Sequence, residues 1–190
     1  MNDENFLNHL IRQSQQGGQF EYLYFWGHSP KQANTADKSC FSQWFPAQFE
    51  ADGVEYPTAE HYMMAQKAKL FNDEEAFAQI LQVTHPNEAK PLGRKVRNYN
   101  EQLWREKRFE IVVQANLAKF SQHPELSAVL LATHERILVE ASPVDKIWGI
   151  GMAQDHEHIQ DPAQWNGLNL LGFALMQVRA QLLAQQRGTA

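Results

Sequence analysis

A carboxylate and an ammonium group share one face of a predicted helix. Glu60, Met64 and Lys67 are spaced at i, i+4 and i+7 in the segment YPTAEHYMMAQK, so their side chains leave the helix on the same side. Such a face could point into a polar pocket and supply an acid or base together with an anion-binding group. The alternative is that Glu60 is only a first-turn acid that stabilises the helix dipole.

A second group of candidates lies in the loop SPVDKIWGIG, residues 142–151. A tryptophan in a glycine-flanked loop needs a structural or ligand-binding reason, and Trp148 is such a residue. Gly149 and Gly151 would let the backbone approach a ligand, and Asp145 could present a carboxylate beside the indole. The alternative is that Trp148 fills the core while Asp145 caps a turn.

Other chemistries have less support in the sequence. The basic clusters at residues 94–97 and 105–108 could each anchor a phosphate, although such clusters are commonly solvated helix faces. His156 and His158 lack the i, i+4 spacing of a helical zinc site, and Cys40 is the single cysteine. The sequence has no dinucleotide-binding glycine motif, P-loop or nucleophile elbow. We therefore expect neither a metal nor a cofactor.

The elements that must position these residues are mostly helices. Aromatic and β-branched residues predict strands at residues 20–26 and 136–141, and Asp52-Gly53 predicts a hairpin turn. Capping residues and apolar periodicity predict helices at residues 59–70, 73–83, 87–93, 101–120, 125–133 and 168–183. The sequence thus predicts one mainly helical α+β domain over residues 20–184, with a frayed tail (185–190) and a flexible N-terminal segment (1–19) in which a short, loosely held helix precedes a polar loop.

Composition narrows the class of protein further. The 190 residues are 43% hydrophobic and 21% charged, which is typical of a globular domain. A net charge of −5 argues against a broad nucleic-acid-binding face, although a local phosphate pocket remains compatible with it. With a single cysteine, no signal-peptide pattern and no long apolar run, we expect a cytoplasmic protein that does not enter a membrane.

Several motifs, in one order, resemble the YbiA-like or NADAR family. They are FWGHSP (25–30), FSQWFP (41–46), YPTAEHYM (56–63), EAK (88–90), LGR (92–94), KF (119–120), PEL (124–126), WGIG (148–151), GLNLLG (167–172) and LMQVR (175–179). The resemblance covers roughly residues 20–183 and implies a largely helical α+β fold. It also implies an N-glycosidase that acts on ribosylated pyrimidine intermediates of riboflavin biosynthesis. Other branches resemble enzymes that remove ADP-ribose from guanine bases. Residues 155–165 read as an insertion before the last helix.

The resemblance assigns roles to individual residues. Glu60 and Asp145 are the candidate catalytic carboxylates for a reaction with an oxocarbenium-like transition state. The candidate substrate-binding residues are Trp26 and Trp148 for stacking on the base, Lys67 and Arg94 for the phosphate, Gly149 for close backbone approach, and Asn169 for the ribose.

The predicted function is hydrolysis of the N-glycosidic bond of a phosphorylated ribosylaminopyrimidine, a small-molecule substrate, without a metal. One alternative is removal of ADP-ribose from guanine, with ADP-ribosylated nucleic acid as a partner. Another is a non-catalytic module that binds ADP-ribose or a related nucleotide. The sequence leaves the oligomeric state open.

Overall fold

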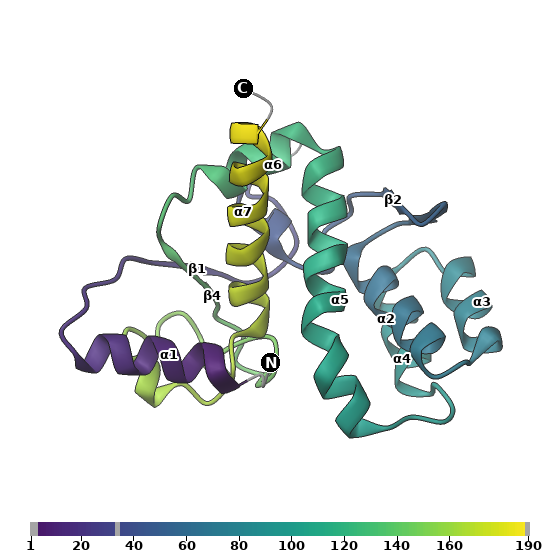
Figure 1. Ribbon diagram of the computed structural model, residues 1–190, viewed down its shortest axis with the longest axis horizontal. Coiled ribbons are helices and arrows are strands. Elements are labelled where there is room, and N and C mark those ends of the chain that lie inside the picture. Colours follow the sequence, from purple (N-terminus) through teal and green to yellow (C-terminus); the bar gives the residue numbers. More distant parts are fainter. Residues whose placement is uncertain (1–3, 33–34, 189–190) are drawn as a thin grey trace.

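Two long helices run side by side through the centre of the molecule. The computed structural model describes residues 4–32 and 35–188, and in it α5 (Glu101–Gln122) packs along α7 (Leu170–Gly188) (Figure 1). The predicted apolar stripe of the last helix is buried here through Leu171, Leu175, Val178 and Leu182. The expected mainly helical α+β fold is confirmed.

Three shorter helices lie together on one side of α5 (Figure 1). They are α2 (Ala59–Leu70), α3 (Glu74–Gln82) and α4 (Pro86–Arg94). The oxygen of Thr58 caps α2 by accepting the backbone N–H of His61. Gly93 lets α4 lie against α2, because a Cβ at this position would come within 2.0 Å of the Met64 sulfur.

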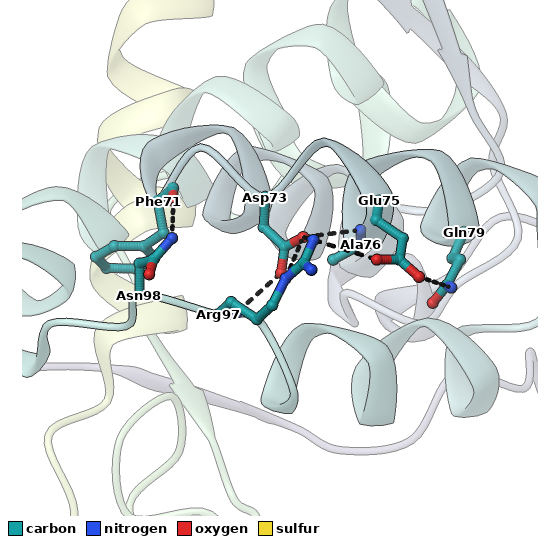
Figure 2. Close-up of polar contacts among 7 residues, drawn as sticks. All are labelled: Phe71, Asp73, Glu75, Ala76, Gln79, Arg97 and Asn98. Carbon is teal, nitrogen blue, oxygen red and sulfur yellow. Dashed lines mark hydrogen bonds and ion pairs between the residues drawn. The ribbon is translucent and has the colours of Figure 1, made fainter.

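A buried carboxylate ties the start of α3 to the chain that follows α4. The Asp73 side chain accepts hydrogen bonds from the backbone N–H of Ala76 and from the backbone and guanidinium of Arg97 (Figure 2). The shortest of these joins Arg97 Nη2 to Asp73 Oδ1 at 2.6 Å. These bonds hold the pKa of Asp73 well below its usual range. Arg97 is therefore part of the scaffold.

The strands form two separate pairs. β1 (Tyr22–Phe25) runs parallel to β4 (Ile137–Glu140), with Phe25 opposite Glu140. β2 (Phe49–Ala51) and β3 (Val54–Tyr56) form an antiparallel hairpin. Its turn residues Asp52 and Gly53 have φ values of 53° and 73°, the left-handed conformation that a tight two-residue turn requires. The predicted hairpin is therefore confirmed, as are both predicted strands.

The N-terminal region contains the predicted short helix, but the helix is docked on the domain instead of being loosely held. Residues 4–15 form α1 (Glu4–Gln15), which packs beside the β1–β4 pair, whereas residues 1–3 lie outside the described part of the chain (Figure 1). The Phe6 ring stacks 4.5 Å from that of Phe109, and Leu10 is buried. The prediction missed the apolar face made by residues 6, 7, 10 and 11, which is short but sufficient to dock a helix.

Residues 152–165 complete the apolar cluster in which Leu10 of α1 is buried, which is separate from the main core. Ile159 and Trp165 are buried in it, and the Trp165 indole N–H donates to the Ile159 carbonyl at 2.8 Å. The short 3-10 helix η2 (Pro162–Gln164) contacts α1. The segment that reads as an insertion thus provides part of the surface on which α1 packs.

The remaining elements connect these parts. The 3-10 helix η1 (Lys38–Phe41) precedes the hairpin, and α6 (Pro124–Leu131) follows α5. Residues 185–188 continue α7 as its last turn, and residues 189–190 lie outside the described part of the chain. Among residues 4–32 and 35–188, no helix combines the length and apolar character needed to cross a bilayer.

Candidate active site

A cavity of about 490 Å³ lies where α2, α4 and the end of β4 meet the loop at residues 142–151. Its charged and aromatic lining comes from segments that are far apart in the sequence. The acids are Glu60, Glu140 and Asp145, the bases are Lys67, Lys90, Arg94 and Lys146, and the tryptophans are Trp44, Trp104 and Trp148. This combination is typical of a ligand site, because charged groups converge on an aromatic wall.

Glu60 is the most deeply buried acid of this cavity. Only 2% of its surface is exposed, and its Oε1 has no hydrogen-bond partner among the described residues. Its backbone N–H donates to the Gln43 carbonyl at 3.0 Å, which fixes the first turn of α2. Burial raises the pKa of Glu60 to about 7, with Asp145 acting in the same direction and Lys90 in the opposite one. The side chain can therefore exchange a proton near neutral pH.

Three cationic side chains reach the cavity from two helices. Lys67 lies on the same face of α2 as Glu60, with its Nζ 4.4 Å from the ring centroid of Tyr99, and burial lowers its pKa. Lys90 and Arg94 are one turn apart on α4 and also line the cavity. Together they form a positive region suited to a phosphate group.

Asp145 fulfils both of the roles that the sequence allowed. Its Oδ1 accepts the backbone N–H groups of Ile147 and Trp148 at 2.9 and 2.8 Å, so it closes the turn that carries the tryptophan. The same side chain and Trp148 also line the cavity. Asp145 thus holds Trp148 in place and contributes negative charge to the site.

Glu140 is a site residue that the sequence analysis missed. It ends β4 and lines the cavity, and its Oε2 is buried without a hydrogen-bond partner in the described structure. Burial raises the pKa of Glu140 to about 8, and the negative charges of Asp145 and Glu60 add to this effect. Lys90 opposes it. Burial thus favours the protonated form of this carboxyl.

Three predicted substrate-binding residues do not line the cavity. Trp26 follows β1 and is 61% exposed. Asn169 is fully buried, where its Oδ1 accepts the backbone N–H of Glu140 and its Nδ2 donates to the Leu138 carbonyl, both at 2.9 Å. A Cβ at Gly149 would lie 2.9 Å from the Glu140 carbonyl oxygen, so this glycine allows the loop to close onto β4. Asn169 and Gly149 therefore support the strand that carries Glu140.

The segment before the hairpin forms another wall of the cavity. Gln43 is buried, with its Oε1 accepting from Asn116 Nδ2 at 2.7 Å, and its Nε2 is unpartnered in the described part of the chain. The buried Lys119 ammonium donates to the carbonyls of Cys40 and Ser42 at 2.8 and 3.2 Å. Two side chains of α5 thus hold this segment, and its Gln43 carbonyl accepts the Glu60 N–H at the start of α2.

Some of the missed residues carried a signal in the sequence. Gln43 and Trp44 belong to the motif FSQWFP, and Lys90 ends the motif EAK, so the resemblance already included them. Glu140 closes the apolar run ILVE and reads locally as the end of a buried strand.

The histidine-rich loop lies outside the cavity. His156 and His158 are exposed, and His158 Nε2 is 3.6 Å from a carboxylate oxygen of Glu157. Across the described ranges, no group of three or more His, Cys, Asp or Glu side chains has an arrangement suited to a metal ion.

The sequence and the fold both match known proteins. The NADAR domain model matches residues 24–183. N-glycosidase R617 of Acanthamoeba polyphaga mimivirus is 44% identical over 167 residues, which cover 85% of this chain and 96% of that protein. N-glycosidase YbiA of Escherichia coli strain K12 is 35% identical over 150 residues, 79% of this chain and 83% of that protein.

A relative under another name and a solved structure agree with these matches. Protein irg-1 of Caenorhabditis elegans is 40% identical over 162 residues, covering 77% of this chain and 76% of that protein. The NMR structure of Escherichia coli YbiA superposes with a TM-score of 0.70 at 32% identity and covers 89% of each chain. The segment matched by the domain model contains every residue named above as lining the cavity.

Proposed function

The chain belongs to the NADAR domain family, and on that premise we propose that it is an N-glycosidase acting on phosphorylated ribosylaminopyrimidines, intermediates of riboflavin biosynthesis. The observation that carries the proposal is the placement of Glu60. This buried carboxyl, with its pKa near 7, shares one cavity with Asp145 and with a set of cations and tryptophans. The relatives named N-glycosidase support the reaction type.

Each part of the cavity corresponds to one need of the reaction. Cleavage of the bond between ribose C1′ and the base nitrogen passes through an oxocarbenium-like transition state, which a nearby carboxylate stabilises. Glu60 takes a proton from the attacking water, because a general base works best when its pKa lies near the working pH. Asp145 adds negative charge beside the developing cation.

The substrate is held by the groups around these carboxylates. Lys67, Lys90 and Arg94 bind the phosphate, since ammonium and guanidinium groups form strong charge-assisted hydrogen bonds with it. The indoles of Trp148 and Trp44 offer flat apolar surfaces for the base. In this scheme the chain's own residues supply every step without a metal or cofactor.

The first experiment compares two substrate classes. Purified protein is incubated with EDTA and either a ribosylaminopyrimidine phosphate or ADP-ribosylated guanosine, and the released base and sugar phosphate are measured by mass spectrometry. Release from the pyrimidine supports the proposal. Release from guanosine alone would replace it with ADP-ribose removal, and binding without turnover of either would indicate a nucleotide-binding module.

A pair of variants tests the role of Glu60 in the same assay. Glu60→Gln keeps the side-chain size but removes the base, so turnover should fall by about 10²–10⁴-fold. Glu55→Gln, the same substitution on the exposed side of the hairpin, should behave as wild type. If folded Glu60→Gln keeps wild-type turnover, Glu60 is not the base.

A further inference from the structure

The cavity contains a second buried carboxyl for which the mechanism above has no use. Glu140 lines the same space as Glu60 and Asp145, and its Oε2 is buried without a partner in the described residues. An unpaired buried carboxyl oxygen is costly to keep, so it calls for a functional explanation. The resemblance motifs gave no role to this residue.

The backbone of Glu140 is held from three sides. Its N–H donates to Asn169 Oδ1 at 2.9 Å, and its carbonyl accepts the Ile150 N–H at 3.0 Å. The parallel pairing with β1 places it opposite Phe25. Gly149 permits the close approach of the loop to this carbonyl. Such a framework fixes the position from which the carboxyl enters the cavity, as a group that transfers a proton requires.

Charged groups from several elements around the cavity face the two glutamates. Glu60 and Lys67 approach from α2, Lys90 and Arg94 from α4, and Asp145 and Lys146 from the loop. Burial comes first in raising the pKa of Glu140 to about 8, Asp145 and Glu60 add to it, and Lys90 lowers it. Glu60 has the lower pKa, about 7. Two carboxyls that share one cavity, each with a buried oxygen free of partners among the described residues, are suited to act as an acid and a base on the same substrate.

We propose that Glu140 is the proton donor to the departing base, acting opposite Glu60 across the scissile bond. This inference rests on the proposed function. The bond between C1′ and the base nitrogen breaks, and its electron pair goes to the nitrogen, which takes the proton from the Glu140 carboxyl. The oxygen of water bonds to C1′ and gives its proton to Glu60. Proton exchange with solvent then restores both side chains, and the net reaction is hydrolysis.

The test is the pH dependence of turnover in Glu140→Gln, with a ribosylaminopyrimidine phosphate as substrate. The amide preserves the shape of the side chain and its ability to donate a hydrogen bond, but it has no proton to transfer. We expect kcat to fall by about 10²–10⁴-fold with KM within about threefold of wild type. The wild type should lose activity as the pH rises above about 8, and the variant should lack this alkaline decline.

Two further variants separate a chemical role from a structural one. Glu140→Asp retains the acid on a shorter side chain, so it should keep part of the activity and the alkaline decline. Glu55→Gln, on the exposed hairpin, is the matched control. Urea unfolding of each variant shows whether it is folded, and if Glu140→Gln is not, Glu140→Asp decides through its pH profile.

The outcomes distinguish this inference from the proposed function. An active wild type with Glu140→Gln at wild-type kcat overturns the role of Glu140 alone, as does a weakened variant that keeps the alkaline decline. A Glu140→Asp variant without that decline also overturns it. A wild type inactive on the ribosylaminopyrimidine phosphate overturns the proposed function, and the role of Glu140 in this reaction falls with it.

Discussion

Replacing Glu60 with glutamine should change how the stability of the protein depends on pH. The folded state raises the pKa of this carboxyl from 4.5 to about 7, so the folded protein holds the proton more tightly than the unfolded chain does. The stability linked to the protonated side chain is complete below about pH 4.5 and is lost as the pH rises through the folded-state pKa. Over that window the loss amounts to about 3 kcal/mol.

Glutamine does not ionise, so the Glu60→Gln variant is free of this loss. The free energy of unfolding of the variant minus that of the wild type should therefore increase by about 3 kcal/mol between about pH 4.5 and about pH 8.5. The change of this quantity between the two pH values is the informative one, because the amide itself also alters the free energy of unfolding by an amount that does not depend on pH. The change will be somewhat larger than this, because removing the Glu60 charge also lowers the pKa of Glu140, so the variant loses less stability when Glu140 ionises.

Urea unfolding at the two pH values measures this difference. Glu55→Gln is the control, because the same substitution at an exposed position of β3 should give a difference that is flat with pH. A flat profile for Glu60→Gln would refute the reasoning, since it would mean that the fold does not hold the proton on Glu60. If this free-energy difference rises with pH and the variant also loses turnover, the Glu60 carboxyl serves the reaction at the expense of stability.

Three further substitutions test how the scaffold supports the cavity. Gly93→Ala places a Cβ against the Met64 side chain, so the free energy of unfolding measured in urea should fall by about 1–3 kcal/mol. In the double variant, Met64→Ala should recover part of this loss instead of adding to it. Asp73→Asn should lower Tm by about 2–4 °C at neutral pH without changing turnover. Because the folded-state pKa of Asp73 is depressed, the stability that its carboxylate contributes is lost as the pH falls through that pKa. The melting curves of the variant and the wild type should therefore converge in acid. A difference in Tm that stays constant with pH would contradict this. Asn169→Ala leaves the backbone N–H of Glu140 and the carbonyl of Leu138 without a partner, so the free energy of unfolding should fall by about 1–3 kcal/mol for each group. A rise in KM with unchanged stability would instead support the predicted role of Asn169 in ribose binding.

Local sequence patterns predicted the parts of the site that lie on one helix. The spacing of Glu60, Met64 and Lys67 fixes their common face whatever the rest of the chain does, and all three line the cavity. Caps predicted the starts of α2 and α5 for the same reason, since Thr58 and Asn100 act within three residues. The hairpin turn at Asp52-Gly53 is equally local.

Residues whose position depends on distant contacts could not be placed in this way. Glu140 enters the cavity because β4 pairs with β1, more than a hundred residues earlier in the chain. Asn169 has a polar side chain in a motif shared with the family, and nothing local shows that both ends of its amide bind β4. Trp26 has the residue type of a stacking group, but the end of β1 leaves it exposed. Local chemistry therefore suggested these roles, whereas the placement of each side chain depends on tertiary contacts that no local pattern encodes.

The unpaired groups of the cavity are held in place by paired groups just behind them. Glu60, Glu140 and Gln43 each keep a buried polar atom without a partner in the described structure, which weakens the fold. Behind Gln43 stands the Asn116 amide, and behind Glu140 stands the Asn169 amide. The Asn116 amide binds the side-chain oxygen of Gln43, whose Nε2 has no partner in the described structure. The Asn169 amide binds the backbone N–H of Glu140, whose Oε2 likewise has no partner there. These supporting hydrogen bonds use other atoms than the unpartnered ones that face the cavity. A ligand can therefore bind the unpartnered atoms without first breaking a hydrogen bond of the fold.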